Sequence, residues 1–274
     1  MEDENRASEI SLDRTEWERR ETALITGASE GIGYELTKLF ACNGYNLVLV
    51  ARNEAKLNQI REDLSRAQGI SVKVIVKDLS KSNAPYEIYD ELKKDGIRVN
   101  ILVNNAGYMV YGLFTETELS QELDMLQVLV WSPLVLTKLF LKDISREGGG
   151  KILNIGSIGS FNPGPLSAVY FAAKAFILSF SHAIAEELAV KNIAVTALCP
   201  GGTRTQFHHR GNIENLFASK YGLMSAEKVA ETGYKALMSN KRHVVPGIAN
   251  KVIVFTGRLA PWTFRAKVAK AFMS

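Results

Sequence analysis

The sequence is poor in cysteine and has no long apolar run. Its 274 residues include two cysteines, Cys42 and Cys199, which lack the spacing of a metal site and fall in a predicted helix and a predicted strand. We therefore expect two buried thiols rather than a disulfide, in a reducing, cytoplasmic compartment. No uninterrupted apolar run is long enough to cross a bilayer, and the acidic start, residues 1–5, lacks the apolar core of a signal peptide.

Histidine content and net charge exclude further classes of function. None of the four histidines lies near other potential metal ligands at a suitable spacing, so we predict no bound metal. The formal net charge of +4 is small and dispersed, and no nucleic-acid-binding motif accompanies it, so nucleic acid is not expected as a partner. With 46% hydrophobic residues, the chain is expected to form one soluble domain at 21–250. Residues 1–20 read as a flexible tail and 251–274 as an extension.

Short runs of Val, Ile and Leu alternate with helical patterns along the chain. The runs predict strands at 23–26, 46–50, 71–76, 99–103, 151–156 and 193–199. Strands separated by crossover helices are typical of an α/β fold, in which a doubly wound parallel sheet lies between two helical layers. Ligands of such sheets bind beyond the carboxyl ends of the strands.

A glycine-rich turn follows the first predicted strand. Residues Gly27 to Gly33 read GASEGIG and lead directly into an amphipathic stretch from Tyr34 to Cys42. Glycines let the backbone turn tightly and approach a phosphate, whose charge is attracted by free N–H groups and the helix dipole. We interpret this turn as a dinucleotide pyrophosphate site; the alternative is an ordinary tight connection.

Tyr170 and Lys174 are four residues apart in a predicted helix. That spacing places the phenol and the ammonium on the same face, one turn apart. A nearby cation favours the phenolate and lowers the tyrosine pKa, which makes the tyrosine a candidate general acid–base. The alternative is a solvated helix face.

These motifs together resemble the classical short-chain dehydrogenase/reductase family in order and spacing, over roughly residues 20 to 245. The motifs are Thr26 to Gly33, Asn104 to Gly107, Ser157, Tyr170 with Lys174, and Pro200 with Gly201. The resemblance implies a Rossmann-like, three-layer α/β/α single domain. It also implies hydride transfer between a nicotinamide cofactor and a carbonyl or alcohol carbon.

The resemblance implies a role for each site residue. Tyr170 would donate a proton to the carbonyl oxygen, Ser157 would hold that oxygen, and Lys174 would lower the tyrosine pKa and bind the nicotinamide ribose. Ser160 competes for the serine role and ranks behind Ser157, whose interval to Tyr170 is that of the family. The cofactor would contact Gly27, Ser29, Glu30, Gly31, Ile32, Gly33, Arg52, Asp78, Leu79, Asn105, Ala106, Gly107, Tyr170, Lys174, Pro200, Gly201 and Thr203.

The end of the second predicted strand bears on the choice of cofactor. Residues 49–53 contain no carboxylate that would bind the ribose hydroxyls of NAD, whereas Arg52 offers a planar fork of donors to a 2′-phosphate. The sequence therefore favours NADP(H) over NAD(H), unless Arg52 is only a solvated cation. Asp78 resembles the family position that contacts the adenine. Glu30 adds no support, because many phosphate-preferring relatives carry a basic residue there.

Leu129 departs from the family pattern. The family places an asparagine in the long helix before the serine strand, where it holds a water that links the lysine to solvent. Leucine cannot do this, and the nearest amide, Gln127, points elsewhere on a helix. We favour an enzyme in which other waters reprotonate Tyr170. The alternative is a cofactor-binding regulatory or scaffold protein with little turnover.

The substrate side is less well defined. Three segments are expected to line it: 108–114, 158–166 and a lid from 202 to about 223. Met109, Phe161 and Phe207 in these segments favour an apolar ketone or aldehyde, including 3-oxoacyl or steroid-like compounds, over a sugar, although these side chains would also suit a core. His208 to Arg210 read either as a contact for an anionic substrate group or as a solvated basic turn.

The end of the chain lacks acidic residues. From Pro246 onward there is no Asp or Glu, while Lys and Arg alternate with large apolar residues. Such a basic amphipathic segment either lies on an anionic membrane surface or uses its apolar face to cover the substrate pocket or a subunit interface, which we favour. The resemblance further implies a homodimer or homotetramer paired through long helices at about 118–145 and 167–191.

Overall fold

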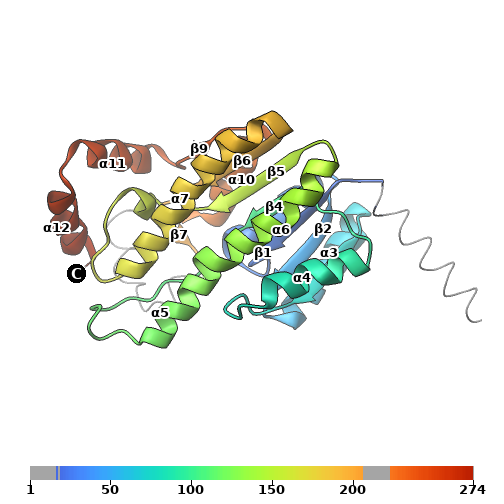
Figure 1. The fold of residues 1–274 in the computed structure, drawn as a ribbon, viewed down its shortest axis with the longest axis horizontal. Coiled ribbons are helices and arrows are strands. Elements are labelled where there is room, and N and C mark those ends of the chain that lie inside the picture. Colours follow the sequence, from blue (N-terminus) through green and yellow to red (C-terminus); the bar gives the residue numbers. More distant parts are fainter. Residues whose placement is uncertain (1–16, 18, 206–222, 274) are drawn as a thin grey trace, which may run out of the picture.

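A parallel sheet forms the centre of the molecule. The computed structural model describes residues 17, 19–205 and 223–273, and within them a seven-stranded sheet has the order β3-β2-β1-β4-β5-β6-β9 (Figure 1). All neighbouring strands are parallel. The strands are β1 (Thr22–Thr26), β2 (Asn46–Ala51), β3 (Val72–Val76), β4 (Ile101–Asn104), β5 (Gly150–Ile155), β6 (Ile193–Leu198) and β9 (His243–Val244). The strand order reverses between β1 and β4, and ligands of doubly wound sheets bind at such a point.

Helices cover both faces of the sheet. One layer contains α2 (Gly31–Cys42), α3 (Glu54–Gln68) and α10 (Ala226–Met238), and the other contains α4 (Ala84–Lys94), α6 (Ser132–Arg146) and α7 (Ala168–Leu188). Successive β1 residues alternate between the layers: Leu24 packs in the same core cluster as Phe140 of α6, and Ile25 in the same cluster as Phe40 of α2. The predicted three-layer α/β/α fold is therefore confirmed.

The predicted helix at 118–145 is divided. It consists of α5 (Leu119–Leu126), a π-helical turn η1 (Gln127–Trp131) and α6. Pro133 near the start of α6 has no N–H to offer the carbonyl of Leu129, so the usual helical hydrogen bond cannot form there. A π-turn accommodates this loss by shifting the hydrogen-bond spacing by one residue.

Two helical stretches, Leu119–Arg146 with 28 residues and Ala168–Lys191 with 24, are long and apolar enough to cross a membrane by length and composition alone. In this structure both cover the sheet: α6 contributes Leu136 and Phe140 to the core, and α7 contributes Ala185 and Leu188. Of the apolar part of each stretch, 50% is buried in Leu119–Arg146 and 33% in Ala168–Lys191, so only one side of each supplies core side chains.

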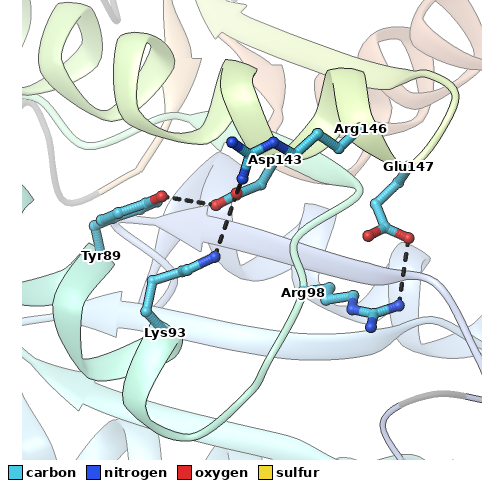
Figure 2. A network of polar contacts seen from close by, with 6 residues as sticks. All are labelled: Tyr89, Lys93, Arg98, Asp143, Arg146 and Glu147. Carbon is cyan, nitrogen blue, oxygen red and sulfur yellow. Dashed lines mark hydrogen bonds and ion pairs between the residues drawn. The ribbon is translucent and has the colours of Figure 1, made fainter.

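A polar network joins α4 to α6 (Figure 2). Tyr89 donates a hydrogen bond of 2.9 Å to Asp143, Lys93 pairs with the same carboxylate at 3.3 Å, and Arg98 pairs with Glu147 at 3.4 Å. Exposed pairs of this kind each contribute little to stability. Asp143 and Glu147 lie just before β5, so the network is at the amino-terminal edge of the sheet.

The C-terminal helices lie together at one end of the molecule (Figure 1). They are α11 (Ile248–Leu259) and α12 (Trp262–Met273), and α11 crosses the predicted boundary between residues 250 and 251. A two-stranded sheet of β7 (Thr203–Arg204) and β8 (Met224–Ser225) precedes them. Most of the predicted tail and most of the predicted lid lie outside the described residues.

The two cysteines differ from the expectation. Cys199 is buried as predicted, but Cys42 is exposed. Cys42 is the last residue of α2, where the helix face has turned toward solvent, so its helical position did not imply burial.

Candidate active site

A cavity of about 1130 Å³ opens at the carboxyl ends of the strands. Every predicted catalytic and cofactor-binding residue lines it except Gly33. The topology of the sheet thus brings together motifs that are far apart in the sequence.

The glycine-rich turn forms one wall of this cavity. Gly27 and Gly31 have φ values of +66° and +58°, a left-handed conformation that side-chain-bearing residues rarely adopt. Gly33 lies beneath the turn, where an added Cβ would collide with the carbonyl oxygen of Gly27 and the side chain of Asn105. Its role is therefore steric, which explains its absence from the cavity wall.

Asn105 ties the turn after β1 to the turn after β4. Its side-chain amide donates to the carbonyl oxygens of Thr26 at 2.9 Å and Gly27 at 3.2 Å. In return, the Thr26 hydroxyl accepts hydrogen bonds from the backbone N–H groups of Asn105 at 3.0 Å and Ala106 at 3.1 Å. These bonds fix the positions of the two turns relative to each other at the carboxyl ends of β1 and β4.

The end of the cavity near β2 and β3 is rich in cations. Arg52, Lys56 and Lys81 line it together with Asp78. Burial opposes ionisation of Asp78, but hydrogen bonds from Ser80 and the charges of Arg52 and Lys81 outweigh it and lower the pKa of this carboxyl. Lys56 and Lys81 were not expected at this end of the cavity. Lys56 lies in the first turn of α3, a few residues after Arg52, and this closeness in the sequence was the available signal.

Ser157, Tyr170 and Lys174 meet at the centre of the cavity. Ser157 follows β5, and Tyr170 and Lys174 lie on successive turns at the start of α7. Tyr170 shares a hydrogen bond with Ser157. The Lys174 ammonium lies 5.7 Å from the centre of the Tyr170 ring and donates a hydrogen bond of 2.7 Å to the carbonyl oxygen of Ile155.

The pKa of Tyr170 moves against the expectation from its spacing to Lys174. Burial raises the pKa of Tyr170 to about 12, although the hydrogen bond with Ser157 acts in the opposite direction. Burial also lowers the pKa of Lys174 to about 8, so both groups resist the charged form. The predicted lowering of the tyrosine pKa is wrong for this structure, because burial outweighs the interactions that favour the phenolate. Tyr170 is therefore a protonated acid at neutral pH.

Ser157 rather than Ser160 faces the cavity. The Ser160 hydroxyl accepts a hydrogen bond of 3.1 Å from the backbone N–H of Ser157, and the Ser157 hydroxyl accepts one of 3.0 Å from Gly159. These bonds cap the short helix η2 (Ile158–Phe161). Ser160 is buried behind the cavity wall, which agrees with its lower rank.

Leu129 is buried in the π-helical turn beside the catalytic residues. A Cβ added to Gly107 would lie 2.8 Å from Leu129 Cδ2 and 3.9 Å from Lys174 Nζ. The leucine side chain and the ammonium group are therefore close to each other, beside Gly107. The side-chain oxygen of Gln127 is buried without a hydrogen-bond partner among the described residues. Leu129 packs in an apolar cluster with Met109, Met125, Tyr170 and Ala173.

The C-terminal helices form the other wall. Of the alternatives for this segment, the structure supports the one in which an apolar face covers the pocket: the cavity is lined there by Ile253, Phe264, Val268 and Met273. Phe161 was expected in the wall but packs in a core cluster with Val254 instead. Phe207 and residues 208–210 lie outside the described residues.

Comparison with known proteins places this site in a family. The family model described as short chain dehydrogenase matches residues 21–215. The chain is similar to the very-long-chain 3-oxoacyl-CoA reductase of Phaeosphaeria nodorum, with 37% identity over 63% of this chain and 52% of that protein. It is also similar to the mouse 17-beta-hydroxysteroid dehydrogenase type 3, with 36% identity over 65% of this chain and 58% of that protein. The match thus spans a little over half the length of these relatives.

Solved structures show the same architecture. A short-chain dehydrogenase from Sphingobium yanoikuyae in complex with NADPH aligns with a TM-score of 0.79 and 28% identity, over 87% of this chain and 93% of that one. A bulky-bulky ketone specific alcohol dehydrogenase from Comamonas testosteroni aligns with a TM-score of 0.74 and 28% identity, over 87% and 92% of the two chains.

Proposed function

Because the chain belongs to the short-chain dehydrogenase family, we propose that it is an NADP(H)-dependent oxidoreductase that acts on a carbonyl or alcohol carbon of an apolar substrate. The observation that supports this proposal is the meeting of Ser157, Tyr170 and Lys174 in the cavity that also contains the glycine-rich turn. The volume of about 1130 Å³ exceeds the roughly 300–1,000 Å³ of typical ligand pockets, as expected for a site that holds two ligands.

The residues present fit a dinucleotide. The turn at Gly27 and Gly31 keeps its left-handed backbone free of side chains at the start of α2, where N–H groups attract a pyrophosphate. When bound, the nicotinamide would supply or accept the hydride.

The remaining chemistry belongs to the chain. In the reductive direction, Tyr170 donates its proton to the carbonyl oxygen, and the Ser157 hydroxyl holds that oxygen in place. The Lys174 ammonium, one helical turn from Tyr170, stabilises the phenolate that forms. Such proton transfer by a positioned side chain contributes typically about 100-fold to 10,000-fold to the rate.

A preference for NADP(H) over NAD(H) is part of the proposal. Arg52, Lys56 and Lys81 line the end of the cavity where the adenosine ribose would lie, and no carboxylate follows β2 directly. Cations at this position would bind a 2′-phosphate.

The substrate class rests on the C-terminal wall and on the relatives. Ile253, Phe264, Val268 and Met273 present apolar surface to the cavity. The names of the similar proteins refer to 3-oxoacyl-CoA and to hydroxysteroids. We propose an apolar ketone or aldehyde, 3-oxoacyl or steroid-like in kind.

Oxidation of NADPH over a panel of apolar ketones, aldehydes, 3-oxoacyl thioesters and 3-oxosteroids tests the proposal. We expect turnover with at least one class, faster with NADPH than with NADH, and its loss in Tyr170→Phe with cofactor binding retained.

Leu129 favours a second candidate, a cofactor-binding regulatory or scaffold protein with little turnover. Its apolar side chain lies beside Lys174, where a route to solvent would be needed. Tight NADPH binding without turnover on every class would support this candidate over the reductase.

A further inference from the structure

The C-terminal helices have a second apolar face that the cavity does not use. On α11 this outer face consists of Ile248, Val252, Phe255 and Leu259, whose exposed fractions range from 54% for Val252 to 81% for Ile248. Their spacing of four, three and four residues aligns them along one side of the helix. Trp262, at the start of α12, is also exposed, with an exposed fraction of 63%.

The opposite side of α11 accounts for the contacts with the rest of the molecule. Asn250, Ile253 and Gly257 line the cavity, and Val254 packs in a core cluster. The two interpretations of this segment are therefore compatible, because the side that covers the cavity and the outer face are different surfaces.

Positive charge borders the outer face. Lys251 lies on α11 beside the apolar stripe, and Lys267 and Lys270 lie on α12. Arg258 is on α11 as well, but its guanidinium lies over the Phe161 ring, 5.3 Å from the ring centre. There is no Asp or Glu between Pro246 and the end of the chain. Exposed apolar side chains on a segment whose charged residues are all cationic suit an anionic lipid surface, which takes up the apolar groups and attracts the charges.

We propose that the outer face of α11 and α12 docks on the surface of an anionic lipid bilayer. A second copy of this chain fits less well, because a two-fold interface would place the same patch against itself. The cations that border each patch would then face one another without an acidic partner from this segment.

The rim of the cavity lies next to this face. Phe264 and Val268 line the cavity and are also exposed at the surface. Arg265 fixes α12 in this position by donating a hydrogen bond of 3.2 Å to the carbonyl oxygen of Phe161. A docked molecule would therefore present this side of the cavity to the bilayer, in which an apolar substrate concentrates.

Co-flotation of the full chain with vesicles of phosphatidylglycerol and phosphatidylcholine tests the proposal at low salt. The test variant is Phe255→Asp with Leu259→Asp, which places two carboxylates on the outer face. The control is Val190→Asp, which places a carboxylate at an apolar residue that is 89% exposed and lies in the short helix after α7, outside α11 and α12. Thermal unfolding followed by circular dichroism checks that each variant is folded.

We expect the unsubstituted chain and Val190→Asp to float with the anionic vesicles and to be released by high salt. The double variant should bind at least about tenfold more weakly, because the outer face supplies both the apolar area and its charge. Absence of vesicle binding in the unsubstituted chain would overturn the proposal, as would equal binding by the double variant. A dimer that the double variant dissociates, without lipid binding, would assign the face to a second copy. Binding is measured without turnover, so the result is independent of the proposed reductase activity.

Discussion

Tyr170 and Lys174 share a buried site, and burial moves their pKa values in opposite directions. The pKa of Tyr170 rises to about 12, so the phenol keeps its proton over the physiological range. The pKa of Lys174 falls to about 8, so the charge that would stabilise the phenolate is present below this pH and lost above it. The phenol thus keeps the proton that it would donate, and we expect the charge of Lys174 to stabilise the phenolate that forms.

A pH profile of ketone reduction follows from these values. We expect kcat/KM to stay level below a pH of about 8 and to fall above it, as Lys174 loses its charge. In Lys174→Arg, kcat/KM should not decrease above a pH of about 8, since a guanidinium remains protonated in this range. The profile is measured between mildly acidic and mildly alkaline pH with saturating NADPH. A rate that rises through the pKa of Lys174 would contradict this role.

Leu129→Asn tests whether the missing amide limits turnover. We expect turnover to rise by up to about tenfold, below the roughly 100-fold that positioned proton transfer typically provides. The free energy of unfolding should also fall by about 1–3 kcal/mol, because a polar group enters the apolar cluster around Tyr170. Leu129→Met serves as the control that keeps the site apolar. An unchanged steady-state rate in Leu129→Asn would show that the relay is not limiting.

Arg52→Asp tests the proposed cofactor preference. Loss of a charge-assisted hydrogen bond and gain of a like charge should lower kcat/KM for NADPH by about 10-fold to 100-fold, with little loss for NADH. Arg61→Asp, on the exposed side of α3, is the control for a change in net charge outside the cavity. Equal losses with the two cofactors would argue against phosphate recognition by Arg52.

At the level of elements, the turn between β1 and α2 depends on close packing. An added Cβ at Gly33 would collide with Gly27 and Asn105, whereas one at Gly44, which has a φ of +80°, would meet open space. Both positions resist a side chain, but for different reasons: collision at Gly33 and backbone strain at Gly44.

Gly33→Ala should therefore weaken NADPH binding as well as stability. The collision is expected to cost about 1–3 kcal/mol, which corresponds to a lower melting temperature by roughly 2–4 °C for each kcal/mol. Gly44→Ala should lower the melting temperature and leave NADPH affinity unchanged. Thermal unfolding and cofactor titration of the two variants provide the comparison. Unchanged NADPH affinity in Gly33→Ala would mean that the turn does not hold the cofactor.

The elements also show what a sequence reveals. The strands β1, β2 and β5 were predictable because short runs rich in Val, Ile and Leu are typical of buried strands in a parallel sheet. The π-helical turn was not, because it depends on how Pro133 disturbs the hydrogen bonds of a helix that periodicity reads as continuous. The short edge strand β9 has only two residues and owes its place to pairing with β6.

The cavity residues divide in the same way. Ser157, Tyr170 and Lys174 were predictable from motifs of fixed spacing. The C-terminal segment was expected to cover the pocket or a subunit interface. The sequence did not decide between these, because the positions of Phe264 and Arg265 depend on how α11 and α12 fold back over the strand ends. Sequence periodicity shows that a helix has an apolar face but not what covers it.

For the whole molecule, subunit pairing and cytoplasmic localisation stay predictions. The outward side of α7 carries the exposed Phe176, which stacks on Phe180 at 5.7 Å between ring centres. We expect a homodimer or homotetramer in solution, and we expect Phe176→Glu to shift its mass toward the monomer in sedimentation analysis. A monomeric unsubstituted chain would contradict this arrangement.

The central claim is that one cavity brings a reduced nicotinamide and an apolar carbonyl together for hydride transfer. The most direct test is a single turnover with NADPH deuterated at the transferable position, followed by mass spectrometry of the alcohol product. The account predicts one deuterium at the former carbonyl carbon, and none with Tyr170→Phe on the same time scale. NADPH that binds tightly while no deuterium reaches any ketone, aldehyde, 3-oxoacyl thioester or 3-oxosteroid would contradict it.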